Sequence, residues 1–125
     1  MVLCSSIENG DWEVSDCDMM GKLPDYIWSE KSGNEFFLKF SGGFLGLYYI
    51  VAKDSGILEY SVDGGAWKEF SCWDQYALSF DRPHFAILEA SLEEKSHCVR
   101  IRNSGRKDEK SIGTRICIGA LAVQI

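Results

Sequence analysis

The sequence contains few of the residues from which catalytic sites are usually built. Its 125 residues include only two histidines, His84 and His97, and no Gly-x-Ser-x-Gly segment that would present a hydrolase nucleophile. A serine hydrolase needs a nucleophile, a histidine base and an orienting acid. Gly42-Gly43 is not followed by the Lys-Ser/Thr of a phosphate-binding loop. The sequence therefore predicts a chain that is not an enzyme by itself.

Cysteine is present, but in no pattern that indicates a zinc site or a disulfide framework. The cysteines are odd in number and far apart, at Cys4, Cys17, Cys72, Cys98 and Cys117. Zinc sites use closely spaced ligand pairs, and secreted frameworks normally use an even number of cysteines. Free thiols in a reducing compartment follow, and residues 1–11 lack the basic and apolar regions of a signal peptide. We therefore expect a cytoplasmic protein.

Positive charge and long apolar runs are also scarce. The 13 lysines and arginines stand against 19 acidic residues, which leaves a net charge of −6, and a negative field repels nucleic acid and anionic lipid. The basic stretch from Arg100 to Lys110 contains Asp108-Glu109 and is typical of a solvated loop. The longest apolar run, Phe44 to Ala52, is too short to span a bilayer. We expect neither a nucleic acid partner nor a membrane.

Acidic residues are frequent, but they do not form a recognisable proton-transfer or metal site. Glu93-Glu94 and Asp108-Glu109 lie in polar turns, whereas a general acid needs burial. Asp16 and Asp18 lack the further ligands and the glycine of an EF-hand loop. We therefore expect no cofactor. A structural calcium ion stays open, because backbone carbonyl ligands do not show in a sequence.

The hydrophobic periodicity is that of β-strands. Glu35 to Ser41 alternates, and Gly42-Gly43 is expected to end that strand. In Ile57 to Val62 the even-numbered residues are apolar and predicted to face inward, with Glu59 and Ser61 outward. Asp63-Gly64-Gly65 is a strong hairpin signal, because glycine accepts the positive φ of tight turns. We predict a three-stranded antiparallel meander from Phe44 to Phe70.

Further strands are predicted on both sides of that meander. They cover Trp12–Val14, His84–Ala90, His97–Asn103 and Arg115–Ile125, and Met19–Ser32 is expected to be a loop or one helical turn. The last strand is almost wholly apolar, so we expect it to be central and covered on both faces. About eight short strands without an amphipathic helix predict one all-β domain over residues 1–125, less regular over 1–34. An antiparallel sandwich or jelly roll fits best. An immunoglobulin-like sandwich would need a Cys…Trp…Cys spacing that is missing.

Aromatic residues are the richest functional signal. The four tryptophans, together with Tyr26, Tyr48, Tyr49 and Tyr76, exceed the needs of a small core, and a flat ring with a polar edge suits the apolar face and hydroxyl rim of a sugar. Trp67, at the start of a hairpin strand, and Trp73 and Tyr76, in the loop that follows, are the candidate ligand-binding residues. The alternative is that such aromatics fill the core or an interdomain contact.

Three segments resemble a known family. They are Phe44-Leu45-Gly46-Leu47, the run Asp54-Ser-Gly-Ile-Leu-Glu-Tyr-Ser-Val-Asp-Gly-Gly-Ala-Trp67, and His97-Cys-Val-Arg-Ile-Arg102. They resemble the jelly-roll accessory domain attached to SGNH/GDSL-type hydrolases, with similar modules in carbohydrate esterases. The resemblance covers residues 36–125. It implies a galactose-binding-like jelly roll beside a catalytic SGNH domain that holds the catalytic Ser, Asp and His, none of which matches a position here. It also implies structural roles for Asp63-Gly64, as a tight turn, and for His97, as a strand start that bonds a loop.

Two functions from different classes remain. The first is a non-catalytic accessory module of an SGNH/GDSL-type carbohydrate esterase, which assists glycan binding or substrate positioning. The second is a structural module that packs on another domain or dimerises and binds no ligand. A small hydrolase with an unrecognised site is a third reading, which the scarcity of histidine disfavours.

Overall fold

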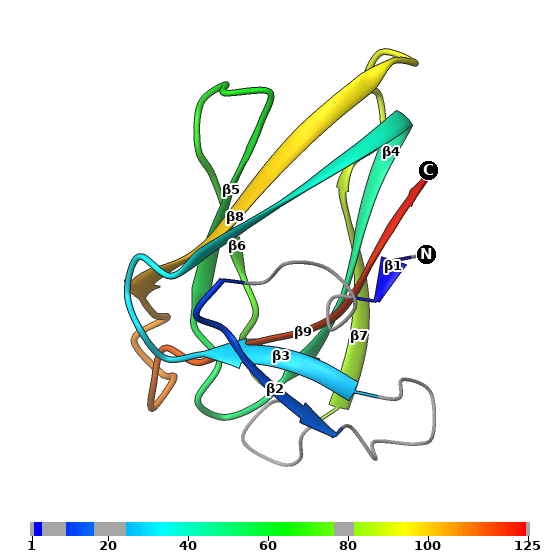
Figure 1. Ribbon diagram of the computed structural model, residues 1–125. Helices are drawn as coiled ribbons and strands as arrows, with labels where there is room; N and C mark the ends of the chain where they lie inside the picture. Colours follow the sequence, from blue (N-terminus) through cyan, green and yellow to red (C-terminus); the bar gives the residue numbers. More distant parts are fainter. Residues whose placement is uncertain (1, 4–9, 17–24, 77–81, 125) are drawn as a thin grey trace.

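The computed structural model describes residues 2–3, 10–16, 25–76 and 82–124, and these form an antiparallel β-sandwich (Figure 1). The described residues contain no helix, and therefore none that crosses a membrane. The strands are β1 (Val2–Leu3), β2 (Glu13–Asp16), β3 (Asp25–Ser29), β4 (Glu35–Val51), β5 (Ile57–Val62), β6 (Lys68–Ser71), β7 (Arg82–Glu89), β8 (Ser96–Arg106) and β9 (Ile116–Gln124). The predicted all-β jelly-roll class is confirmed.

The long strand β4 forms the corner that makes two layers out of one hydrogen-bonded sheet. The predicted break at Gly42-Gly43 is wrong, because β4 continues through both glycines. Gly42 has φ 98°, a conformation that side chains with a Cβ rarely adopt, so the strand bends without ending. Before the bend β4 pairs with β8, and after it β4 pairs with β7 and β9. A bent glycine in a strand is typical of a sandwich corner.

The two layers follow from these pairings. The first layer has the order β2-β3-β9-β4-β7, with β1 also beside β9, and the second layer has the order β4-β8-β5-β6. Figure 1 shows β5, β6 and β8 lying across from β7 and β9. Side-chain contacts tie the layers at their open edge. The Tyr60 hydroxyl donates to the Leu88 carbonyl at 3.0 Å, the Tyr49 and Phe70 rings meet edge to face, and Lys68 of β6 pairs with Glu89 of β7.

The meander predicted from Phe44 to Phe70 is correct only in its second half. β5 and β6 form the predicted hairpin, and Asp63 (φ 55°) and Gly64 (φ 73°) both have the positive φ of a type I′ turn. The second half of β4, however, pairs with β7 and β9, while β5 pairs with β8. The chain crosses from one layer to the other between β4 and β5, so sequence neighbours are not sheet neighbours there.

The N-terminal part is more ordered than expected. Asp25–Ser29 is strand β3 rather than loop or helical turn, because β2 and β9 hydrogen-bond it on both sides. Residues 19–24 of the segment expected to be irregular lie outside the described residues. The short strand predicted at Trp12–Val14 is β2, shifted to Glu13–Asp16.

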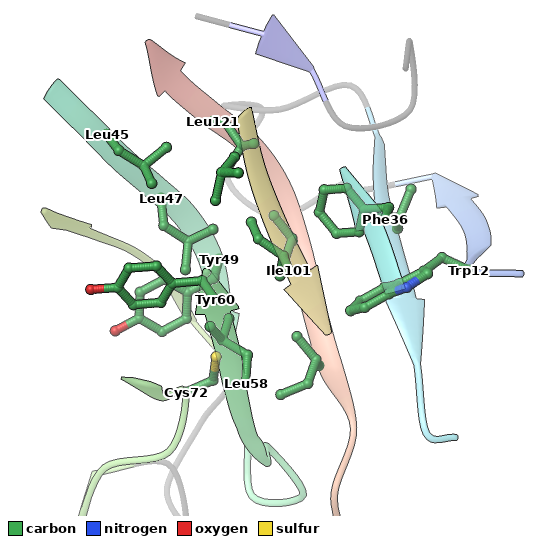
Figure 2. Packing of buried hydrophobic residues seen from close by; sticks show 14 of the residues in the cluster. Trp12, Phe36, Leu45, Leu47, Tyr49, Leu58, Tyr60, Cys72, Ile101 and Leu121 are labelled. Carbon is green, nitrogen blue, oxygen red and sulfur yellow. The ribbon is translucent and has the colours of Figure 1, made fainter. Parts of the chain in front are cut away.

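The hydrophobic core fills the space between the layers (Figure 2). Trp12 meets Phe36 edge to face at one end, and Leu47 and Ile101, both 0% exposed, face each other near the middle. The prediction for the last strand is confirmed: β9 lies between β3 and β4, and Ile118 and Ala120, on opposite faces, are both 0% exposed. Trp12, which is 4% exposed, belongs to this core and offers no surface to a ligand.

Candidate functional site

Trp67, the first of the predicted ligand-binding residues, lies on the outer face of the second layer. Its indole lies against two arginines of β8, with the guanidinium carbon of Arg102 at 3.7 Å and that of Arg100 at 5.2 Å from the ring centroid. Since β5 separates β6 from β8, the indole must reach across β5. Ser61 of β5 faces outward yet is only 1% exposed, and its hydroxyl donates to the Gly65 carbonyl at 2.8 Å.

Strand register aligns Trp67 with side chains from three neighbouring strands. Phe37 of β4 is opposite Arg100 of β8, and Arg100 is opposite Ser61 of β5. The β5–β6 register, continued by one residue, places Trp67 opposite Ser61. We call these four residues the cross-strand row. With neighbouring strands about 4.8 Å apart, the row is about 14 Å long. It ends in an exposed aromatic ring, because Phe37 is 52% exposed.

The arginines of this face are held by glutamates. Arg100 Nη2 is 2.7 Å from Glu35 Oε1, and Arg102 Nε is 3.1 Å from Glu59 Oε1. Arg106 makes a further ion pair with Glu59 at 3.2 Å. Ion pairs at a surface contribute little to stability, but they fix where the charged groups lie. The result is a face on which hydrogen-bond donors and acceptors lie beside aromatic rings, with the charges nearly balanced.

Trp73 and Tyr76 lie elsewhere. They follow β6, whereas Trp67 precedes it, so the strand separates them from Trp67. Trp73 packs against the hydrophobic core, and its indole nitrogen is buried without a hydrogen-bond partner. Tyr76 is 60% exposed, and its amide donates to Asp74 Oδ1 at 2.9 Å. A hydrogen bond from Arg82 lowers the pKa of Asp74 and anchors this loop to β7.

His97 resembles a catalytic histidine only superficially. It lines a cleft of about 550 Å³ together with Ser41, Ser96 and Asp63. Its Nδ1 is 2.6 Å from Asp63 Oδ2, and its Nε2 is 2.7 Å from the Glu93 carbonyl oxygen. Both partners are acceptors, so both ring nitrogens donate and neither is left to accept a proton from a serine. The bond to Asp63 and the bond to the Glu93 carbonyl raise the pKa of His97.

This histidine instead fastens a turn and a loop, in the role that the family resemblance implies for it. Asp63 Oδ1 also accepts from the Cys98 amide at 2.8 Å, and the Asp63 amide donates to the Cys98 carbonyl at 2.8 Å. The hydrogen bonds from His97 and Cys98 lower the pKa of Asp63. The hairpin turn that leads to Trp67 is thereby fixed to the start of β8.

The outer face of the first layer has a different chemistry. Phe85 of β7 lies 4.6 Å from the Tyr48 ring and 6.5 Å from the Phe44 ring, centroid to centroid. Phe85 is 37% and Ile87 is 56% exposed. We call these four residues the β7 apolar face. No local sequence pattern indicates this face, because its members come from two strands, β4 and β7, whose pairing had not been predicted.

Neither a metal centre nor a disulfide occurs among the described residues. No three histidine, cysteine or acidic side chains gather there at metal-binding distances. Asp18, half of the pair considered for calcium, lies outside the described part, so that expectation stays a prediction. Cys72 and Cys98 are free thiols, and burial raises the pKa of Cys72.

Three residues on the outer face of the second layer had not been selected from the sequence, namely Phe37, Arg100 and Arg102. One signal for them was present: Arg100 and Arg102 alternate with Val99 and Ile101 in the sequence, and the structure buries the two apolar residues and places both arginines on the opposite strand face. Phe37 faces the opposite way from Phe36 and Leu38 by simple alternation. What joins these side chains to Trp67 is register between four strands, which a local pattern does not contain.

Comparison with known proteins gives a shared fold but no family. No protein-family model matches the chain, and no curated protein is similar to it in sequence. Among solved structures, it is similar to a two-domain esterase active on acetylated mannans, crystallised with mannopentaose, at a TM-score of 0.62 and 16% identity. It is also similar to a family 35 carbohydrate-binding module from Clostridium thermocellum, at a TM-score of 0.55 and 12% identity. A Paenibacillus xanthan lyase matches at a TM-score of 0.68 and 11% identity.

The share of each protein that matches differs. The match covers 79% of this chain and 28% of the esterase, and 98% of this chain and 13% of the lyase. For the carbohydrate-binding module it covers 95% of this chain and 91% of that one. The chain therefore spans about a quarter of the esterase, and at these identities the likeness shows the fold alone.

Proposed function

We propose that this chain is a non-catalytic accessory module of a carbohydrate-active enzyme and that it binds a glycan beside a catalytic domain. The observation that carries the proposal is the outer face of the second layer, where Trp67 and Phe37 flank arginines paired with glutamates. Sugars offer apolar C–H faces and hydroxyl groups that both donate and accept hydrogen bonds. Aromatic rings beside fixed donors and acceptors match both properties.

Two further observations support the proposal. Both nitrogens of His97 are engaged with acceptors, which leaves this histidine unfit as a general base. The fold is shared with a carbohydrate-binding module over nearly the whole length of both chains, and with part of an esterase active on acetylated mannans. Together with the motif resemblance, these matches make an SGNH/GDSL-type carbohydrate esterase our choice for the parent enzyme.

The proposed ligand-binding residues are Trp67, Trp73 and Tyr76, and they differ in what they offer. Trp67 presents an indole on a flat sheet face, and Tyr76 is 60% exposed. Trp73 packs against the core, so it is better placed to support the loop than to meet a sugar directly. We therefore assign stacking first to Trp67.

A catalytic domain needs a surface on which to dock, and the β7 apolar face has the right composition for one. Phe85 and Ile87 are exposed on an edge strand and have the rings of Phe44 and Tyr48 next to them. Exposed apolar patches and aromatic side chains mark protein contacts more often than sugar sites.

The experiment that tests glycan binding is a screen of the purified chain on an array of neutral and acidic oligosaccharides. Each hit is then titrated while tryptophan emission is recorded. We expect a saturable signal that changes tryptophan fluorescence. An array without hits, and no change in emission up to millimolar oligosaccharide, would contradict a glycan-binding module.

The β7 apolar face also favours a second candidate function, a structural or dimerisation module with no ligand. Sedimentation of the isolated chain over a hundredfold range of concentration distinguishes this alternative. A stable dimer without any glycan hit would replace the first proposal with the second.

A further inference from the structure

We infer that the ligand of this chain is a neutral oligosaccharide that lies flat across the strands of the second layer, along the cross-strand row from Trp67 to Phe37. This inference rests on the proposed function, because it assigns the path and the class of the glycan. It departs from the expectation that Trp67, Trp73 and Tyr76 act as one site.

The first argument concerns the path. Trp67, Ser61, Arg100 and Phe37 occupy consecutive strands in one register row. Ser61 is small and 1% exposed, so Arg100 is the one long side chain of the row between the two rings, where its guanidinium offers hydrogen-bond donors. A strip about 14 Å long with an aromatic ring at each end offers stacking at two separated points. Trp73 and Tyr76 follow β6 at its other end and lie off this row.

The second argument concerns the charge of the ligand. A uronate or sulfated sugar needs a cation that is not already paired. Glu35 faces Arg100 at 2.7 Å, and Glu59 faces Arg102 at 3.1 Å and Arg106 at 3.2 Å. An anionic sugar would meet these carboxylates beside each of the three arginines. The exposed Lys39, two positions along β4 from Phe37 on the same strand face, is a cation without an ion pair among the described residues, and it lies at the Phe37 end of the row. Neutral hydroxyls, in contrast, accept from the guanidinium groups and donate to the carboxylates at the same time.

The third argument separates a sugar from a protein partner. The buried centres of protein interfaces are depleted in charged residues, because such residues must lose their water. This row has Glu35, Glu59 and three arginines around it. A glycan, which stays partly hydrated, leaves the outer atoms of these pairs in contact with water. The four members of the β7 apolar face, in contrast, carry no charged group.

The test is isothermal titration of the full chain with four pentasaccharides. Three are neutral, namely mannopentaose, cellopentaose and xylopentaose, and pentagalacturonate is acidic. We expect at least one neutral pentasaccharide to bind more tightly than pentagalacturonate. Phe37→Ala and Trp67→Ala should each weaken that binding by between about twofold and tenfold, which is the effect of losing one aromatic contact. Tyr76→Ala tests the alternative arrangement, because Tyr76 lies off the row. Ile87→Ala removes an exposed apolar side chain of the β7 apolar face and is the matched control, which we expect to bind like the unchanged chain.

Phe37→Ala is the most informative variant, because Phe37 is 52% exposed and removal of its ring leaves no buried cavity that would destabilise the fold. Circular dichroism and the melting temperature establish that both variants are folded. Binding that survives Phe37→Ala but is lost in Tyr76→Ala overturns the cross-strand path and leaves the proposed function intact. Tighter binding of pentagalacturonate overturns the ligand class. If none of the four binds, the inference fails together with the glycan-binding function. A change of oligomeric mass in Phe37→Ala, with glycan binding unchanged, would instead assign the row to a protein contact.

Discussion

The two outer faces of this sandwich are built by the same kind of sheet but differ in what they present to solvent. The outer face of the second layer combines Trp67 and Phe37 with arginines, and each of those arginines forms an ion pair with a glutamate. The β7 apolar face of the first layer presents Phe85 and Ile87 with no ion pair among its four members. One face is aromatic and polar, and the other is aromatic and apolar.

If the proposed function is correct, this difference shows how one small fold could present separate surfaces to two unlike partners. A wet, charged and partly aromatic face loses little when a hydrated sugar binds, whereas an apolar face gains from being covered by protein. A β-sandwich keeps the faces apart because its core lies between them, so a substitution on one face does not reach the other by contact. An accessory module must meet both a glycan and a catalytic domain, and this arrangement allows both contacts at once.

The largest expected effect comes from Asn103, whose side chain connects the two layers. The two outer faces exist as separate surfaces only while the layers are packed together. Asn103 of β8 is 0% exposed and donates to the Ser29 carbonyl at 3.0 Å and the Thr114 carbonyl at 2.8 Å, while its oxygen accepts from the Gly105 amide. Asn103→Ala removes these three hydrogen bonds, of which the bond to the Ser29 carbonyl is buried and the other two are partly buried. We expect a loss of about 2–4 kcal/mol in the free energy of unfolding, measured in urea.

The control for that variant is Asn34→Ala. Asn34 donates one side-chain hydrogen bond, to Ser29 Oγ at 2.8 Å, from a half-buried position. We expect it to cost about 1 kcal/mol. Equal losses in the two variants would show that Asn103 is not the tie between the layers.

A smaller effect, opposite on the two faces, is expected from a matched pair of phenylalanine substitutions. Phe85→Ser removes a ring 4.6 Å from Tyr48, so it should cost about 1 kcal/mol of stability. It should also reduce the binding of a hydrophobic dye and leave oligosaccharide affinity unchanged. Phe37→Ser should change stability by less than about 0.5 kcal/mol, because it is a surface substitution, but should weaken oligosaccharide binding.

Dye fluorescence, urea unfolding and titration with mannopentaose, cellopentaose and xylopentaose measure the pair. Reduced oligosaccharide affinity in Phe85→Ser, with Phe37→Ser unaffected, would reverse the assignment of the two faces. Equal effects of both variants on both readouts would show that the faces are not independent.

Local patterns in the sequence predicted the parts of the fold that short-range chemistry determines. The Asp63-Gly64-Gly65 turn needs positive φ at its centre, and glycine and aspartate supply it. Arg100 and Arg102 alternate with buried residues along β8, so their outward direction was predictable. β9 is apolar on both faces because it lies inside its layer.

What could not be predicted depends on contacts between segments far apart in the chain. Gly42 looked like the end of a strand, because a local pattern does not distinguish a glycine that ends a strand from one that bends it around a corner. β3 was missed because its partners β2 and β9, not its five residues, make it a strand. Phe37 is aligned with Trp67 only through the registers of three strand pairs, so a local sequence pattern could not indicate that the two residues share one row.

The smallest expected effect is a pH dependence that reaches only the second layer. The pKa of His97 is raised by Asp63 and the Glu93 carbonyl, so its contribution to stability is fully present below pH 6.5, the ordinary value, and is lost as pH rises through the folded value. The pKa of Asp63 is lowered, so its contribution is present above pH 3.8 and is lost as pH falls through the folded value. The pair therefore stabilises the turn before Trp67 most between these two pH values.

Urea unfolding of the unchanged chain and of His97→Gln from pH 5 to pH 9 tests this. The difference between their free energies of unfolding should become smaller as the pH rises. Dye binding at the β7 apolar face, on the other layer, should not follow that trend. A gap that is constant over this range would mean that His97 holds the turn as a neutral ring, through shape and hydrogen bonding alone.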